Sequence, residues 1–173
     1  MRGQENICYV VTRADLGFVL VAQSEKGVCA ILINDSAKDL YEDLVSRFPE
    51  AFITEGDDNL KKLANNIAEF IDNSNTNLDI EMDLRGTDFQ KRVWSVLRTI
   101  PAGMTISYAE VARRMNHPNA ARAVAGACAA NSLAVVVPCH RVVKSNGNVS
   151  GYRWGVDRKR KLLVMERERN CLL

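Results

Sequence analysis

The sequence of 173 residues contains only two histidines and four prolines, and aromatic residues make up 6% of it. No apolar run approaches the roughly 20 residues that a membrane-spanning helix requires, so we expect no membrane partner. The first residues contain no hydrophobic segment of the kind that begins a secretory signal peptide. These absences predict a cytoplasmic protein.

Cysteine is present, but not in a pattern typical of structural disulfides. The five cysteines are odd in number and none belongs to a C-x-x-C pair; they lie at positions 8, 29, 128, 139 and 171. A disulfide framework usually has an even number of cysteines in an oxidising compartment, so we expect reduced thiols. Cys8 and Cys29 have no histidine near them in the sequence, and we assign them no chemistry.

The net charge of +2 hides a division of charge between the two halves. Residues 1–84 contain 7 Lys and Arg against 16 Asp and Glu, whereas residues 85–173 contain 16 against 5. Such asymmetry indicates two functional regions. A basic half could bind a polyanion by displacing its counterions, although a basic surface that is merely solvated has the same composition.

The acidic half has the pattern of a small sheet with two helices. Three short runs rich in Val, Ile and Leu predict a strand meander with turns that contain glycine, over residues 7–12, 17–23 and 27–33. Apolar residues at helical spacing predict helices over 36–48 and 57–72, followed by a polar linker at 73–77. Alternating residues predict an extended segment over 78–84. We interpret this half as a scaffold.

The basic half begins with two S/T-x-x-E/Q capping boxes, Thr87–Gln90 and Ser107–Glu110. The first predicts a helix that ends before Pro101, and the second a helix that ends near Met115. After a break at residues 116–119, a third helix is expected over about 120–130. Two short helices joined by a tight turn are typical of a helix-turn-helix, but also of ordinary helical hairpins.

Almost every side chain of the third helix is small, and Arg122 is the exception. A helix of this kind can pack tightly in a core or lie against a narrow DNA minor groove, but it offers few groups that read bases. Arg122 lies near the helix start, where we expect it to be exposed. A single arginine there could fill the gap left when a base is extruded from a duplex.

The sequence Val137-Pro138-Cys139-His140-Arg141-Val142 contains the strongest chemical signal. A thiolate is the reactive form of cysteine, and a neighbouring base promotes its formation. If this segment is extended, the two adjacent side chains point apart, and His140 would act through a water or a bend in the backbone. A buried strand that ends in a structural cysteine is the alternative.

The motif and its surroundings resemble the O6-alkylguanine-DNA alkyltransferases, also called methylated-DNA–protein-cysteine methyltransferases. The matching segments follow the order and spacing of that family: Ser107-Tyr108, Ala121-Arg122-Ala123-Val124, Asn131, Pro138-Cys139-His140-Arg141-Val142-Val143, Ser150-Gly151-Tyr152 and Glu166. The likeness is closest to the C-terminal domain of bacterial Ada proteins, and no counterpart of the N-terminal Ada domains is found. It implies an α/β fold, with a ribonuclease-H-like domain over 1–84 and a mostly helical, winged-helix-like domain with a helix-turn-helix over 85–173.

The resemblance also implies the activity. An alkyl group would pass irreversibly from O6 of guanine in double-stranded DNA to Cys139, once per molecule and without a cofactor, with O4 of thymine as a second possible source of the group. The protein would act as a monomer that binds the minor groove and flips the base. Some relatives hold a structural zinc in the first domain, but this sequence lacks the histidines for it, so we expect no metal.

Residue roles follow from the same resemblance. Cys139 would accept the alkyl group, His140 would remove the thiol proton, and Glu166 would orient His140. Asn131 would tie the third helix to the active-site segment, and Tyr108 would hydrogen-bond the purine. The DNA contacts would be Tyr108, Ala121, Arg122, Ala123, Lys144 and Ser145, and the substrate pocket would comprise Ala134, Val142, Tyr152, Arg153 and Trp154.

Two functions of other classes use the same residues. A cysteine hydrolase could employ Cys139, His140 and Glu166, but it would turn over repeatedly and would not need a basic half. A non-catalytic DNA-binding regulator would not need Cys139.

Overall fold

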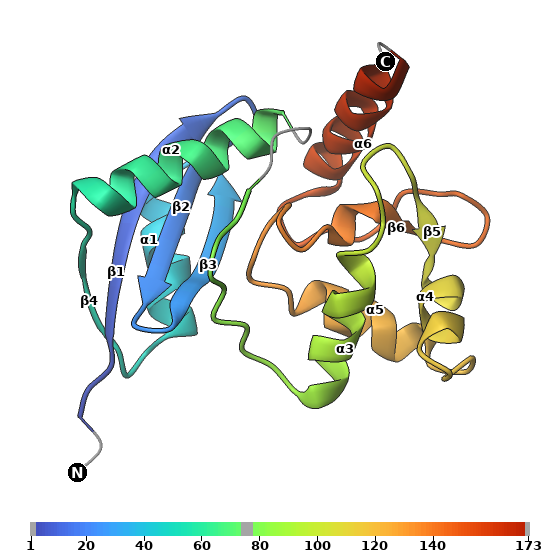
Figure 1. The fold of residues 1–173 in the computed structure, drawn as a ribbon, viewed down its shortest axis with the longest axis horizontal. Helices are drawn as coiled ribbons and strands as arrows, with labels where there is room; N and C mark the ends of the chain where they lie inside the picture. Colours follow the sequence, from blue (N-terminus) through green and yellow to red (C-terminus); the bar gives the residue numbers. More distant parts are fainter. Residues whose placement is uncertain (1–2, 74–77, 172–173) are drawn as a thin grey trace. The chain divides into compact units, whose positions relative to one another are not determined.

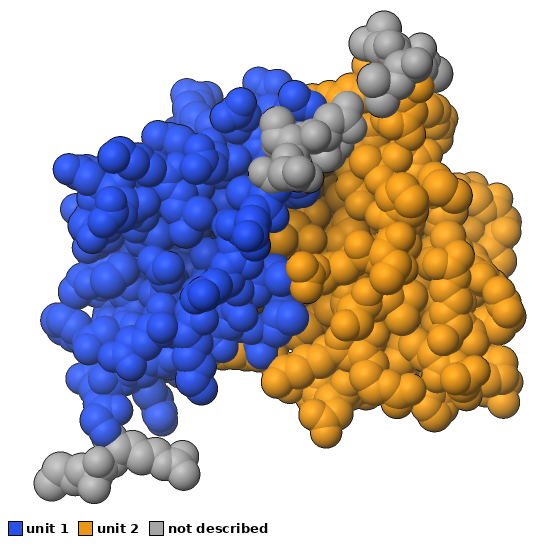
Figure 2. Space-filling view, in the orientation of Figure 1, with its two compact units in different colours: residues 1–84 blue, residues 85–173 orange. Residues whose placement is uncertain are grey.

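A computed structural model of the chain describes residues 3–73 and 78–171. Its contacts divide the chain into two compact units, residues 1–84 and residues 85–173, which Figure 2 colours separately. The boundary coincides with the change from acidic to basic composition. Of the expected polar linker, residues 74–77 lie outside the described residues. No helix in the described ranges is both long enough and apolar enough to cross a membrane.

The first unit is built on a four-stranded sheet of order β3-β2-β1-β4 (Figure 1). Its strands are β1 (Asn6–Ala14), β2 (Gly17–Ser24), β3 (Gly27–Asn34) and β4 (Phe52–Glu55). The first three pair antiparallel, as the meander prediction requires, whereas β4 pairs parallel with β1. The prediction missed β4, because four partly exposed residues give too short a pattern to identify.

Two amphipathic helices cover the sheet, α1 (Ala37–Arg47) and α2 (Asp58–Asp72). Side chains cap both: Ser36 accepts a hydrogen bond from the Asp39 N–H, and Asp57 accepts one from the Leu60 N–H. In Figure 1, α2 crosses one face of the sheet and α1 lies behind it. Strand β3 is buried along nearly its whole length, which fits a sheet covered on both faces.

The extended segment predicted over 78–84 runs beside β3. The Val28 N–H donates to the Glu81 carbonyl, and the Asp83 N–H donates to the Val28 carbonyl, both at 2.8 Å. Gly27 allows this approach, because a Cβ there would lie 2.6 Å from the Glu81 oxygen. The segment therefore completes the sheet unit before the chain enters the second unit.

The second unit is mostly helical. Its elements are α3 (Asp88–Leu97), β5 (Ile106–Ser107), α4 (Tyr108–Arg114), α5 (Ala121–Ala129), a 3-10 turn η1 (Cys139–Arg141), β6 (Val142–Val143) and α6 (Val156–Cys171). The described part of the molecule is thus α/β, with a sheet unit followed by a helical unit. All the helices expected from the sequence are present within a few residues of their expected ends.

The two predicted capping boxes differ in outcome. At Thr87 both reciprocal hydrogen bonds form with Gln90, which confirms the first box. At Ser107 the hydroxyl accepts from the Glu110 N–H, but the Glu110 carboxylate instead bonds Arg113 and Arg114. The second box is therefore only half formed, because two arginines one turn further along compete for the carboxylate.

Two contacts fix the helices around the site. The indole of Trp94 on α3 donates to the Ala127 carbonyl of α5 at 2.9 Å. Strand β5 pairs parallel with β6, which sets Ser107 beside Val143. This short pairing brings the start of α4, and with it Tyr108, to the residues that follow Cys139.

Candidate active site around Cys139

The apolar segment before Cys139 is a series of tight turns, so the alternative of a buried strand ending in Cys139 is wrong. The Val136 N–H donates to the Ala134 carbonyl and the Val137 N–H to the Leu133 carbonyl. Val135 has a φ of 67°, a left-handed conformation that β-branched residues adopt at a cost of roughly 1–3 kcal/mol. The surrounding packing, which leaves Val135 1% exposed, must offset this strain.

Asn131 holds these turns together. Its amide nitrogen donates to the Val137 carbonyl at 2.9 Å and to the Cys139 sulfur at 3.4 Å, while its amide oxygen accepts from the Leu133 N–H at 2.9 Å. The residue is 1% exposed and directly follows the C-terminal cap of α5. Asn131 therefore joins the end of α5 to the cysteine, as the resemblance implies.

Residues far apart in the sequence form a buried polar cluster next to Cys139. Nε2 of His140 lies 2.8 Å from Oε1 of Glu166 on α6. Arg141 donates to both oxygens of that carboxylate, at 3.1 and 2.8 Å, and to the Ile100 carbonyl at 2.6 Å. The bend that turn η1 introduces directs His140 into this cluster, which the sequence alone did not show for an adjacent Cys-His pair.

The electrostatics fix the protonation states of the cluster. Burial raises the pKa of Glu166, but the hydrogen bonds from His140 and Arg141 outweigh it and lower the pKa to about 2, so the carboxylate is ionised at neutral pH. Burial lowers the pKa of His140, despite the opposing effect of Glu166. A neutral His140 must then give its Nε2–H to Glu166, which leaves the lone pair on Nδ1 as the acceptor for a proton.

Cys139 is a protonated thiol at neutral pH. Burial raises its pKa, while the Asn131 hydrogen bond and the positive charge of Lys159 act in the opposite direction. The side chain is only 4% exposed. The group is therefore placed for reaction within the protein rather than for reaction with solvent electrophiles.

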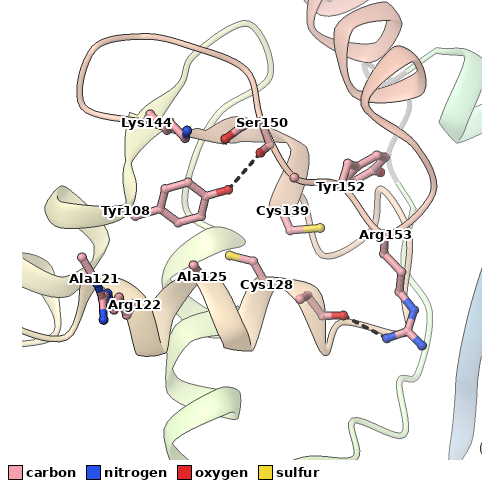
Figure 3. A pocket seen from close by; sticks show the side chains of 12 residues that line it. Tyr108, Ala121, Arg122, Ala125, Cys128, Cys139, Lys144, Ser150, Tyr152 and Arg153 are labelled. Carbon is pink, nitrogen blue, oxygen red and sulfur yellow. Dashed lines mark hydrogen bonds between the residues drawn. The ribbon is translucent and has the colours of Figure 1, made fainter.

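A cavity of about 730 Å³ lies in front of Cys139 (Figure 3). Its lining comprises Tyr108, Ala121, Arg122, Ala125, Cys128, Ala129, Cys139, Lys144, Ser150, Gly151, Tyr152 and Arg153. The residues come from α4, from the small-residue face of α5 and from the loop before α6. The Tyr108 hydroxyl donates to the Ser150 carbonyl at 3.4 Å. Burial is the main cause that raises the pKa of Tyr108 to about 12, and the nearby Cys128 and Cys139 add to this effect.

Comparisons with known proteins agree with this geometry. Residues 88–168 match the family model described as the 6-O-methylguanine DNA methyltransferase DNA-binding domain. The inducible methylated-DNA–protein-cysteine methyltransferase of Bacillus subtilis is 39% identical over 78% of this chain and 75% of its own length. The chain belongs to the family of methylated-DNA–protein-cysteine methyltransferases.

Further relatives extend the likeness over nearly the whole chain. The bifunctional transcriptional activator and DNA repair enzyme Ada of Escherichia coli is 45% identical over 96% of this chain, but over only 48% of its own length. The chain spans about half the length of the first relatives it matches. A crystal structure of the Mycobacterium tuberculosis O6-methylguanine methyltransferase covers 94% of each chain at 33% identity, with a TM-score of 0.76.

Not every residue expected in the substrate pocket lines the cavity. Tyr152 and Arg153 line it, whereas Ala134, Val142 and Trp154 do not. These three side chains are packed in the interior, and Trp154 is 6% exposed, with its ring in a T-shaped contact with Tyr152. Their part in the substrate pocket stays a prediction, and Trp154 contacts Tyr152, which lines the cavity.

The residues expected to contact DNA are solvent-accessible to different degrees. Tyr108, Ala121, Arg122 and Lys144 line the cavity, and Arg122 and Lys144 are exposed as expected. Ala123 and Ser145 are exposed but lie outside the lining. In the parts of the chain that the structure describes, no group of three or more His, Cys, Asp or Glu could hold a metal.

Sequence analysis missed Lys159, which is the most buried charged side chain near the site. Its ammonium donates to the carbonyls of Val142, Ser150 and Gly151 at 2.6, 3.2 and 3.3 Å. The residue lies in a run of basic residues, a composition that is typical of a solvated helix face. A signal was available, because Lys159 shares the spacing of Leu162, Leu163 and Glu166, which form the buried face of α6.

Proposed function

We propose that the protein repairs alkylated DNA by direct reversal, transferring a methyl or other alkyl group from O6 of guanine to Cys139. The observation that carries this proposal is the position of Cys139, between a cavity and the buried His140–Glu166 pair. The relatives' names support it, since they are called methylated-DNA–protein-cysteine methyltransferases. O4 of thymine is a second possible source of the alkyl group.

The transfer is a nucleophilic substitution at carbon. Nδ1 of His140 takes the Cys139 proton through an intervening water, and Glu166 stabilises the resulting imidazolium. The sulfur attacks the alkyl carbon, a C–S bond forms, and the C–O6 bond breaks with its electron pair on the purine. The Tyr108 hydroxyl donates a hydrogen bond to the departing base. The product thioether is a poor leaving group, so each molecule reacts once and needs no cofactor.

The substrate is proposed to be double-stranded DNA, bound by the second unit through the minor groove. The small residues of α5, including Ala121 and Ala123, permit close approach, and Lys144 and Ser145 are placed to meet phosphates. Exposed Arg122 at the edge of the cavity occupies the space left by the flipped base. A structure of the M. tuberculosis relative in complex with DNA, with a TM-score of 0.74 at 32% identity, supports a DNA partner.

The finer fold assignments belong to the same proposal. We infer a ribonuclease-H-like first unit, supported by three antiparallel strands and a fourth parallel to β1, which serves as a scaffold. The helices α4 and α5 with strands β5 and β6 support a winged-helix-like second unit that binds DNA. The active form is proposed to be a cytoplasmic monomer.

Intact-mass measurement tests the function directly. The protein is mixed with duplex DNA containing O6-methylguanine, and one methyl group per molecule, located on Cys139 by peptide mapping, is the expected product. A hydrolase would regenerate an unmodified protein, and a non-catalytic binder would never gain mass. An unchanged mass at DNA excess would therefore contradict direct reversal.

A further inference from the structure

A second cleft in the helical unit lies outside the cavity in front of Cys139. It has a volume of about 550 Å³ and lies between α3 and the end of α4. Its lining comprises Asp88, Lys91, Arg92, Ser95, Val96, Arg114, Met115 and Asn116, none of which lines the Cys139 cavity. Three of these side chains are cationic and one is a carboxylate, so the cleft is positively charged.

The two walls of this cleft are tied together. A terminal nitrogen of Arg92 on α3 donates to the carbonyl of Met115, the C-terminal cap of α4, at 3.2 Å. Met115 itself is buried, at 4% exposure. Asn116 follows with a φ of 60°, a left-handed conformation that asparagine tolerates well, and the chain turns there towards α5. The backbone positions of the cationic residues are therefore set by the fold.

Two of the cations are available to a ligand. The ammonium of Lys91 makes no hydrogen bond or ion pair with any residue that the structure describes, including Asp88 in the same cleft. Arg114 donates its Nε–H to Glu110 at 3.1 Å, but that carboxylate also accepts two hydrogen bonds from Arg113. The terminal nitrogens of Arg114 and the ammonium of Lys91, both on exposed side chains, can therefore donate to an anion with several acceptor oxygens, such as a phosphate.

The cleft adjoins the surface that is proposed to bind DNA. Asn116 begins the turn that connects α4 to α5, the helix proposed to lie in the minor groove. In a helix-turn-helix, the helix before the turn crosses the DNA backbone while the second helix enters a groove. Phosphates follow both edges of a groove, so the end of α4 and the neighbouring face of α3 lie beside one strand of the backbone when α5 is in place.

We propose that this cleft is a second phosphate site, in which Lys91 and Arg114 bind the backbone of the same duplex outside the minor groove. The proposal rests on the proposed function, in which the partner is DNA. A phosphate contact reads no bases, so the site adds affinity and fixes the orientation of the duplex without adding sequence preference. It holds the duplex in register while α5 and Arg122 act at the damaged base.

The test measures binding to an undamaged, fluorescently labelled duplex, which involves no transfer to Cys139. Affinity is followed by anisotropy from about 50 to 300 mM salt in Lys91→Gln, Arg114→Gln and the parent protein. Lys161→Gln is the matched control, because it removes one charge from an exposed position of α6, at the other end of this unit from the α4–α5 turn (Figure 1). Lys91→Arg keeps the charge in the cleft.

The expected size of the effect follows from counterion release. Each phosphate contact contributes about 0.9 to the steepness of log affinity against log salt, which is worth about eightfold at about 100 mM relative to about 1 M salt. Lys91→Gln and Arg114→Gln should therefore each reduce the steepness by about 0.9 and lower the affinity about five- to tenfold at about 100 mM. Lys161→Gln and Lys91→Arg should match the parent.

A parental slope in both glutamine variants of the cleft would overturn the proposal. An equal loss in Lys161→Gln would overturn it too, because the effect would then be one of net charge. Reaction with the free base O6-methylguanine, which has no phosphate, reports on the Cys139 site of each variant; a loss of this rate as large as the loss of duplex affinity would count against the proposal, since the substitution would then have disturbed the fold.

Methyl transfer from O6-methylguanine DNA is measured in parallel on the parent protein. Failure of transfer would contradict the proposed function, while the salt slopes would still decide whether the cleft binds DNA.

Discussion

Replacement of Glu166 with glutamine tests whether the buried cluster depends on a full negative charge. The carboxylate receives hydrogen bonds from His140 and from two nitrogens of Arg141, and it is 2% exposed. Glutamine has the same shape, but it can accept with only one atom and cannot neutralise the guanidinium. The substitution therefore removes charge while it leaves the packing almost unchanged.

The size of the effect follows from the pKa. Lowering the Glu166 pKa from 4.5 to about 2 corresponds to about 3 kcal/mol of stability above pH 4.5. A buried guanidinium left without its counter-charge adds to the loss, and breaking such pairs typically costs about 3–5 kcal/mol. Because the folded carboxyl has the lower pKa, its contribution is complete above about pH 4.5 and is lost as the pH falls towards about 2.

Urea unfolding followed by tryptophan fluorescence measures this loss in the relevant unit, since both tryptophans, Trp94 and Trp154, lie in residues 85–173. We expect the free energy of unfolding of Glu166→Gln to be about 3–5 kcal/mol lower than that of the parent protein at about pH 7. Between about pH 4.5 and 2.5, the stability of the variant should decline less steeply than that of the parent. Glu168→Gln, on the exposed side of the same helix, should behave like the parent. A loss below about 1 kcal/mol, the value of an exposed ion pair, would refute the charged cluster.

Three further predictions concern the reaction. Cys139→Ser should accept no methyl group but bind duplex DNA within about threefold of the parent, because the proposed DNA contacts lie elsewhere; methylation of this variant would assign the acceptor to Cys128 or Cys171. Arg122→Ala should slow repair of duplex at least about tenfold and reaction with the free base O6-methylguanine much less; equal losses on the two substrates would exclude a role in base extrusion. Because burial lowers the pKa of His140 below 6.5, the rate with the free base should stay constant from about pH 8 to 6.5 and decline only below that; a decline centred above pH 6.5 would show that another group is the base.

Local patterns predicted the elements that have strong local causes. The glycine-bearing turns, the capping residue Thr87 and the spacing of apolar residues each act within a few residues, and the corresponding strands and helices are found. Strand β4 has no such local signal and exists because β1 offers it a parallel edge. Its position depends on a long-range pairing that a single sequence does not encode in a readable way.

At the site, too, features with a local cause in the sequence were predicted, and features that depend on long-range packing were not. The Cys139-His140 motif and the resemblance predicted Cys139 as the acceptor, His140 as the base and Glu166 as its partner. The structure brings His140 and Glu166 together. The contact of Trp154 with Tyr152 and its burial could not be predicted, because the direction of a side chain in an irregular loop depends on packing. Lys159 was missed for the opposite reason: its neighbours in sequence are exposed basic residues, and its burial is visible only once the carbonyls of two other segments converge on it.

The resting state of the thiol is consistent with a protein that reacts once. A cysteine with a lowered pKa would react with any electrophile or oxidant, and for a stoichiometric acceptor each such event destroys one molecule. Burial instead raises the pKa of Cys139, and the groups that favour its thiolate, which include the Asn131 amide and the Lys159 ammonium, do not outweigh the effect of burial. A base that fills the cavity excludes bulk water from these groups and strengthens their electrostatic effect on the sulfur. Under the proposed function, the thiolate would thus form mainly when an alkylated base is present to receive its attack.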